Sequence, residues 1–189
     1  MKKIAVFLAD GFEEIEALTV VDVTRRASFN CDIISIEGEL VRSAHNVFVK
    51  ADKLFNEEEL KDYDMIVFPG GLPGAENLAN DERVRKLVKE FNDEKKFIAA
   101  ICASPAMVLS AAGIEENRYI TSYPGEDFEN LLDKANYVEE LVVVDENIIT
   151  SRGPATTLLF AYKIVDVLGG NSESLKEGML WNALEEEKE

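Results

Sequence analysis

Short segments made only of apolar residues alternate along this chain with segments in which apolar residues recur every three or four positions. Segments 4–8, 65–68 and 97–101 are apolar throughout, as expected of strands that are covered on both faces of a sheet. The apolar residues of 84–91 follow the i, i+3, i+4, i+7 spacing of a helix with one buried face. This alternation predicts an α/β fold, a doubly wound domain with a mostly parallel central sheet and helices on both sides.

The same patterns predict the remaining elements. Shorter strands are expected at 32–36, 119–121, 141–144 and 148–150, and the arms of a polar hairpin at 41–44 and 47–51. A first helix is expected to bury Ile15, Leu18 and Val21, which recur at three-residue spacing. Two further helices are expected at 105–112 and near 158–165.

Length and charge limit the classes to which the protein can belong. The chain has 189 residues, the size of one domain, which we expect to span 1–184 with a charged, frayed tail at 185–189. The chain contains 20 Lys and Arg residues and 37 Asp and Glu residues, so its net charge is −17. Such a charge disfavours binding to nucleic acid or to an anionic membrane surface.

The sequence also indicates a compartment. No apolar stretch approaches the ~18 residues that a membrane span needs, and the apolar run that begins at Ile4 is too short for a signal-peptide core. The two cysteines, Cys31 and Cys102, form no spacing motif and are too few for a disulfide framework. We therefore expect a cytoplasmic protein in a reducing environment.

Ligands of doubly wound sheets bind beyond the carboxyl ends of the strands, so the segments that follow strands are candidate site segments. They are 10–16, 69–74, 102–105, 122–124 and 151–154.

Cys102 is the main nucleophile candidate because it stands between an apolar strand and an apolar helix, in the position of a nucleophile elbow. The dipole of the following helix is expected to lower the pKa of its thiol and favour the thiolate. The position of Cys102 between these elements is equally consistent with a small apolar residue of the core. Cys31 has no such turn and is expected to be structural.

Glu16 is one of three glutamates, with Glu13 and Glu14, at the start of the first expected helix. Carboxylates are common in a first turn because they suit the helix dipole. Glu16 differs because it follows Ile15, which is expected to face the core, so its carboxyl is predicted to be half-buried. Burial raises the pKa of a carboxyl and fits it for proton transfer beside a thiol.

Three other features are weaker indicators. Gly70 and Gly71 leave backbone N–H groups unobstructed, which suits an oxyanion hole, but their loop lacks the Lys of a phosphate-binding loop. Ser151 and Arg152 precede a helix. They either bind an anionic substrate or merely cap the helix N-terminus and lie in solvent. His45 is the only histidine, has no companion at metal-ligand spacing, and meets Cys102 only if its hairpin reaches the elbow of the same chain or of a partner.

Four motifs of this chain occur together in a known family. Residues 11–16, 69–71, 99–103 and 150–154 have the order and spacing of the ThiJ/PfpI superfamily. They are most similar to the branch that contains the parkinsonism-associated protein deglycase and bacterial ThiJ-like proteins, over nearly the whole chain. The resemblance implies a flavodoxin-like sandwich that usually forms a homodimer and whose chemistry is independent of a cofactor. We also expect no metal site, because His45 has no companion at ligand spacing.

The resemblance also implies roles for individual residues. Cys102 matches the family's reactive cysteine and Glu16 the protonated glutamate that is hydrogen-bonded to it. Gly70, Gly71 and the amide of Ala103 match the positions that line the oxyanion pocket. In the family, this cysteine is oxidised to sulfinate or attacks a reactive carbonyl such as methylglyoxal, forming a hemithioacetal that rearranges towards lactate.

This chain departs from the family's pattern at two positions. Relatives often carry a histidine where Tyr123 stands, and a phenol with a pKa near ~10 is a poorer base at neutral pH. Protease-like members place a histidine directly after the cysteine, where this chain has Ala103, which argues against peptidase activity. His45 aligns roughly with a basic residue that approaches the partner's cysteine pocket together with an arginine matching Arg26.

Two functions therefore compete. The first is a cofactor-independent glyoxalase or deglycase with Cys102 as nucleophile and Glu16 as acid and base. The second is an oxidative-stress sensor or chaperone in which Cys102 is oxidised to sulfinate without turnover. The same residues serve both functions, so the sequence does not separate them.

Overall fold

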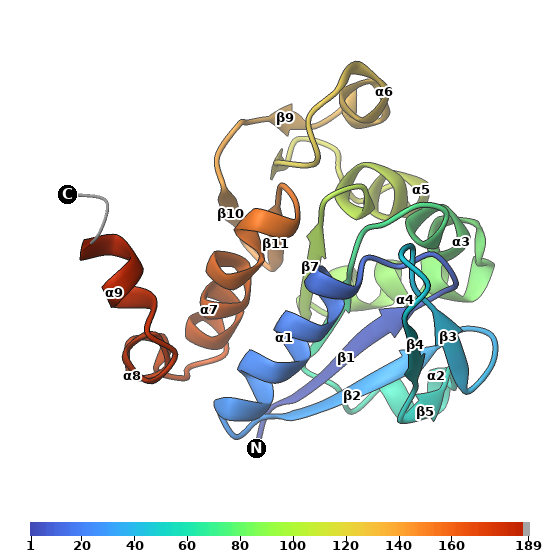
Figure 1. The fold of residues 1–189 in the computed structure, drawn as a ribbon. Coiled ribbons are helices and arrows are strands. Elements are labelled where there is room, and N and C mark those ends of the chain that lie inside the picture. The colour runs from blue at the N-terminus through green and yellow to red at the C-terminus, as the bar shows by residue number, and fades with distance from the viewer. Residues whose placement is uncertain (187–189) are drawn as a thin grey trace.

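A seven-stranded sheet forms the centre of the protein in the computed structural model, which describes residues 1–186 (Figure 1). Its strand order is β10-β11-β7-β6-β1-β2-β5, and all neighbouring strands are parallel except the antiparallel pair β10 and β11. The strands are β1 (Lys3–Leu8), β2 (Asn30–Ser35), β5 (Lys53–Leu54), β6 (Met65–Phe68), β7 (Phe97–Ile101), β10 (Val142–Asp145) and β11 (Ile148–Ser151). The predicted mostly parallel sheet is confirmed.

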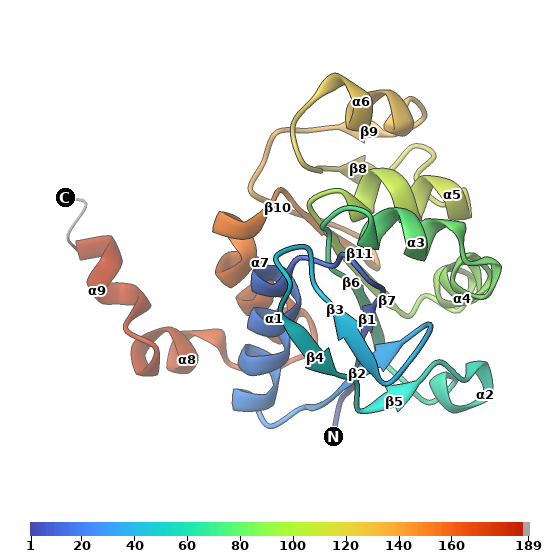
Figure 2. The same cartoon turned by 45° about the vertical axis from the view of Figure 1, so that its right-hand side comes forward.

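Helices cover both faces of this sheet (Figures 1 and 2). One face carries α1 (Glu14–Arg26) and α7 (Thr157–Val167), and the other carries α3 (Gly74–Asn80), α4 (Glu82–Asp93) and α5 (Ser110–Ala112). In α4 the four apolar residues at helical spacing are all buried, as predicted. Each face therefore has its own hydrophobic core, with the sheet between them.

The first helix turns a different face to the core than its apolar spacing predicted. Ile15 is 52% exposed and Leu18 is 36% exposed, whereas Glu16 and the small residue Ala17 are buried. The buried side of α1 packs against α7 and consists mainly of Ala17 and β-branched residues, which let the two helices approach closely. The expectation that Ile15 and Leu18 face the core was wrong. The helix is oriented so that Glu16 lies on its buried side instead.

Other differences lie at the ends of the sheet and in short elements. β8 (Tyr119–Ile120) pairs with β9 (Asn136–Tyr137) in a separate small sheet, and 105–112 begins as a π-helical segment, Pro105–Leu109, before α5. The predicted hairpin forms from β3 (Leu40–Arg42) and β4 (Phe48–Lys50). The sequence patterns missed α3 and the elements α2 (Glu57–Leu60), α6 (Glu126–Glu129), α8 (Ser172–Gly178) and α9 (Trp181–Glu186).

The C-terminal segment was expected to be a frayed tail from 185 onward. Instead α9 continues through Glu186, so the first two residues of that segment are helical, and 187–189 lie outside the described residues. Figures 1 and 2 show α8 and α9 projecting from the body beside α7. None of the helices within 1–186 has the length and apolar character that crossing a membrane requires.

The sheet topology places three loops at one edge. After β1 the chain moves to β2 on one side and later to β6 on the other side, so the strand order reverses between β1 and β6. At such a reversal the loops after the two strands separate and leave a crevice for a ligand. Glu16 lies in the first turn of α1, the helix that follows β1, while Gly70 and Cys102 lie in the loops after β6 and β7.

Candidate active site

Cys102 occupies a strained turn between β7 and the π-helical segment. Its φ is +63°, a conformation that side-chain-bearing residues rarely adopt. The turn is held from both sides, because the Cys102 N–H donates to the Ser151 carbonyl at 3.0 Å and the Cys102 carbonyl accepts from the Tyr123 N–H at 2.8 Å. The thiol is half-buried. This is the geometry of a nucleophile elbow, as predicted.

Ser104, which the sequence did not single out, fastens the elbow to the neighbouring loop. Its hydroxyl donates to the Pro69 carbonyl at 2.6 Å and is buried. Its position two residues after the cysteine was the only available signal, and a serine before a proline more often indicates a helix start.

Glu16 is fully buried and points from the first turn of α1 towards the elbow. Its Oε2 accepts the Gly70 N–H at 2.7 Å, while Oε1 has no hydrogen-bond partner within residues 1–186. Burial raises the pKa of the carboxyl from 4.5 to about 7, although the Gly70 N–H and the Cys102 side chain lower it. The predicted half-buried carboxyl is therefore buried completely, with the raised pKa that was expected.

The absence of a side chain at Gly70 allows the Glu16 carboxyl and the Cys102 thiol to lie close together. A Cβ at this position would lie 2.6 Å from Cys102 Cβ, 2.8 Å from Glu16 Oε2 and 2.9 Å from Cys102 Sγ. Any side chain here would therefore push these groups apart. The loop after β6 thus carries glycine because the segments of Glu16 and Cys102 both come within van der Waals distance of it.

We expect Gly70→Ala to cost about 1–3 kcal/mol of stability, since its methyl group overpacks the site, and to abolish any chemistry that needs Glu16 beside Cys102. Gly38→Ala is the matched control, because a Cβ at Gly38 meets nothing within 4 Å. Thermal unfolding and a Cys102 reactivity assay measure both effects. Equal stability and equal reactivity of the two variants would contradict the close packing at Gly70.

The backbone donors around the sulfur are Gly71 and Ala103. Both N–H groups act on the Cys102 thiol to lower its pKa, whereas the Gly70 N–H donates to Glu16. Of the three expected oxyanion positions, two therefore face the reactive atom and Gly70 instead holds the acid. Donors fixed in this way stabilise negative charge on sulfur or on an oxygen bound beside it.

The pKa of the Cys102 thiol differs from expectation. The helix dipole was predicted to lower it, but burial and the neighbouring Glu16 carboxylate raise it, against the opposing effect of the Gly71 and Ala103 N–H groups. Protonation of Glu16 removes the negative charge beside the sulfur, so the thiol is more acidic when Glu16 holds a proton. The two groups therefore form a coupled pair.

Tyr123 and Ser151 support the elbow rather than the pocket. Tyr123 holds Cys102 through its backbone N–H, while its ring is 44% exposed and packs edge-on against Phe128, with ring centroids 5.8 Å apart. The hydroxyl of Ser151 is buried, donates to the Leu141 carbonyl at 2.7 Å and lies 2.7 Å from the Thr156 hydroxyl. The Ser151 side chain is therefore committed to the local fold and does not face an anionic substrate.

The two arginines of the expected pocket are also engaged elsewhere. Arg152 donates to the Glu139 carbonyl at 2.9 Å, and its guanidinium lies 3.9 Å from the Glu139 carboxylate. Arg26 pairs with Asp22 at 2.7 Å in the last turn of α1, whereas Glu16 is in the first turn. This chain by itself does not bring Arg26 to the Cys102 elbow.

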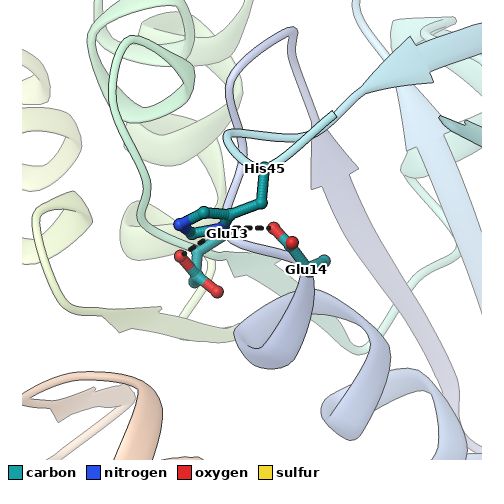
Figure 3. Close-up of side chains that lie close together, drawn as sticks. All are labelled: Glu13, Glu14 and His45. Carbon is teal, nitrogen blue, oxygen red and sulfur yellow. Dashed lines mark hydrogen bonds and ion pairs between the residues drawn. The ribbon is translucent and has the colours of Figure 1, made fainter. Parts of the chain in front are cut away.

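His45 lies beside the start of α1 (Figure 3). Its Nδ1 is 3.1 Å from Glu14 Oε2 and 3.7 Å from Glu13 Oε2, and these carboxylates raise the imidazole pKa. The argument that His45 lacks companions at ligand spacing was wrong, because the fold supplies two from a distant segment. His45 and Arg26 lie at opposite ends of α1, and their approach to a partner's pocket stays a prediction.

Most of the chain is similar to known proteins in sequence and in fold. A model of the DJ-1/PfpI family matches residues 2–167. The chain belongs to the DJ-1/PfpI family. The oxidized Toxoplasma gondii DJ-1 structure superimposes with a TM-score of 0.86 at 35% identity, covering 95% of this chain and 98% of that one. The predicted flavodoxin-like sandwich and the predicted superfamily are thereby confirmed.

Two curated relatives in the DJ-1/PfpI family add to this. Protein DJ-1 homolog B of Arabidopsis thaliana is 39% identical over 175 residues, which are 92% of this chain but 40% of that protein. The chain thus spans less than half of the Arabidopsis relative. The glutathione-independent glyoxalase DJ-1 of Schizosaccharomyces pombe is 31% identical over 88% of this chain and 91% of its own length. Enzymatic activity therefore occurs in the family.

Proposed function

We propose that the protein is a cysteine-dependent, cofactor-independent glyoxalase and deglycase that acts on methylglyoxal or on glycated groups. The observation that carries this proposal is the buried Glu16 carboxyl, with a pKa of about 7, beside the half-buried Cys102 thiol at the elbow. A group with a pKa near the working pH is an effective acid and base. The name of the Schizosaccharomyces pombe relative supports the same chemistry.

In the first step, Cys102 Sγ adds to the aldehyde carbon of methylglyoxal. The carbon–sulfur bond forms as the carbonyl π bond breaks, and the thiol proton passes to the Glu16 carboxylate. The N–H groups of Gly71 and Ala103 stabilise the developing oxyanion. Proton return from Glu16 to that oxygen completes a hemithioacetal.

In the second step, Glu16 removes the proton from the former aldehyde carbon and a proton is delivered to the neighbouring carbon, through an enediol. The product is a lactoyl thioester of Cys102. Water then cleaves the carbon–sulfur bond, releasing lactate and restoring the thiol, so that methylglyoxal and one water give one lactic acid. No external oxidant or reductant is consumed.

The test is lactate formation from methylglyoxal by the purified, reduced protein without glutathione. Intact mass before and after the assay reports oxygen added to the chain. Steady lactate formation by protein of unchanged mass would support the enzyme. Absence of turnover in protein confirmed to be reduced would overturn the glyoxalase proposal.

The alternative is a redox sensor or stress chaperone in which Cys102 is oxidised to sulfinate. Two equivalents of peroxide would add two oxygens to the sulfur and release two waters. The N–H groups of Gly71 and Ala103 and a protonated Glu16 suit the sulfinate oxygens. The solved Toxoplasma gondii relative is described as oxidized. Mass gain at Cys102 with no lactate would favour this function.

We further propose a cytoplasmic homodimer without peptidase activity. Exposed apolar side chains on α1 and on the hairpin support self-association, namely Ile15 (52% exposed), Leu18 (36%) and Phe48 (60%). Ala103 follows the cysteine where protease-like relatives have histidine, which supports the absence of peptidase activity. Light scattering is expected to give twice the chain mass, and a monomer at micromolar concentration would contradict the dimer.

A further inference from the structure

We propose that Glu13, Glu14 and His45 form a binding site for a divalent transition-metal ion of the Zn²⁺ class, next to the Cys102 elbow and separate from it. Figure 3 shows the three side chains converging from the start of α1 and from the hairpin loop. One ligand atom from each lies within 4.8 Å of the others. Imidazole nitrogen and carboxylate oxygen are ligands that Zn²⁺ accepts.

The distances between these ligand atoms fit one metal ion. In a tetrahedral site with metal–ligand bonds of 2.0–2.2 Å, neighbouring ligand atoms are about 3.3 Å apart. His45 Nδ1 lies 3.1 Å from Glu14 Oε2 and 3.7 Å from Glu13 Oε2, on either side of that value. Small side-chain adjustments would therefore place a metal among the three atoms. Three protein ligands leave a fourth position for water.

Glu13 is the most buried of the three ligand residues, with 11% of its side chain exposed against 17% for Glu14 and 67% for His45. The residue is only 8% exposed. Its Oε1 accepts a long hydrogen bond of 3.4 Å from the Ile15 N–H, and its Oε2 accepts none from residues 1–186. The nearest positive group is His45, at 3.7 Å. A carboxylate that is largely shielded from water is stabilised by a cation bound beside it.

Backbone hydrogen bonds fix Glu13 and the hairpin loop in the absence of a metal. The Glu13 N–H donates to the Gly70 carbonyl at 2.9 Å, which ties the cluster to the loop that contacts Cys102. The Ala44 N–H donates to the Phe12 carbonyl at 2.8 Å, which fixes the hairpin loop beside the start of α1. Within one chain, 67% of the His45 side chain is exposed. The net charge of −17 favours cations near the surface.

The experiment is Zn²⁺ titration of Cys102→Ala protein, in which no active-site thiol competes for the metal. Calorimetry gives the affinity and stoichiometry, and NMR follows the imidazole of His45, which is unambiguous because the chain has one histidine. We expect one equivalent of Zn²⁺ to bind and to shift the His45 resonances. Since loss of even a group outside the ligand set weakens metal sites about 10–100-fold, His45→Asn and Glu14→Gln should weaken binding at least about tenfold.

Glu116→Gln is the matched control because it removes one exposed carboxylate outside the cluster and should leave the affinity unchanged. Circular dichroism verifies that each variant is folded. The proposal is overturned if Zn²⁺ binds only when Cys102 is present, if saturating Zn²⁺ leaves the His45 resonances unmoved, or if His45→Asn binds as tightly as its parent. None of these readouts depends on turnover, so the proposed glyoxalase function stands or fails separately.

Discussion

Replacing Cys102 with serine should lower lactate formation from methylglyoxal by at least about 10³-fold. The serine hydroxyl has nearly the same size, so the elbow and its hydrogen bonds to Ser151 and Tyr123 are retained. The hydroxyl is, however, a far weaker acid than the thiol, and a carboxylate with a pKa of about 7 cannot generate useful amounts of alkoxide. Steady-state kinetics without glutathione measure the loss.

Cys31→Ala is the control for this variant. Cys31 is 3% exposed and lies in the core between the sheet and α1, with burial raising its thiol pKa to about 11. Its removal should leave turnover unchanged. If Cys102→Ser retained most of the activity, or if Cys31→Ala lost it equally, the nucleophile assigned to the elbow would be wrong.

The position of the nucleophile was predictable from local sequence together with the family resemblance. An apolar strand, then Cys102 among small residues, then Pro105 and an apolar helix are consistent with a sharp turn, but they fit a small core residue equally well. The central strands were predictable from local sequence alone, since strands such as β6 and β7 are buried on both faces and are apolar throughout. Short elements such as α3 carry few apolar residues, so their pattern is too weak to detect.

The burial of Glu16 was not predictable from spacing. A helix with Ile15, Leu18 and Val21 at regular intervals satisfies a pattern of one apolar face, yet only Val21 of these is buried. The fold places a carboxyl in the core and leaves two large apolar side chains outside. Such inversions of the hydrophobic pattern are expected where function, rather than stability, selects the residue.

The cluster at His45 was missed for a different reason. His45 and Glu14 are 31 positions apart and meet only because the hairpin folds over the start of α1. A search for ligand spacing within one segment cannot find such a pair. The direction of the thiol pKa was missed in a similar way, because burial of Cys102 and the charge of Glu16, both set by the tertiary fold, raise it.

Glu16→Gln should remove a pH dependence from the stability of the fold. The carboxyl has a pKa of about 7 in the folded protein against 4.5 ordinarily. Between these values the folded state holds a proton that the unfolded chain releases, so the free energy of unfolding falls as the pH rises from about 4.5 to about 7. The difference between the two pKa values corresponds to about 3 kcal/mol, lost in full only above pH 7.

Glutamine keeps an oxygen that accepts the Gly70 N–H but carries no charge at any pH. The variant should therefore gain stability relative to the wild type as the pH rises through this range, by about 3 kcal/mol in total. Denaturant unfolding at pH values from 4.5 to 8, with reductant and a chelator present, measures the difference. Titrating groups that do not interact with Glu16 contribute equally to both proteins, so their contributions cancel in the comparison.

Glu116→Gln again serves as the control, since it removes an exposed carboxyl and should follow the wild-type curve. If the free energies of unfolding of the wild type and Glu16→Gln differ by a constant amount from pH 4.5 to 8, the Glu16 carboxyl titrates near its ordinary value of 4.5. It would then be fully ionised at neutral pH and unable to hold the proton that the hemithioacetal step returns. The stability curve thus tests the acid and base of the proposed mechanism without measuring catalysis.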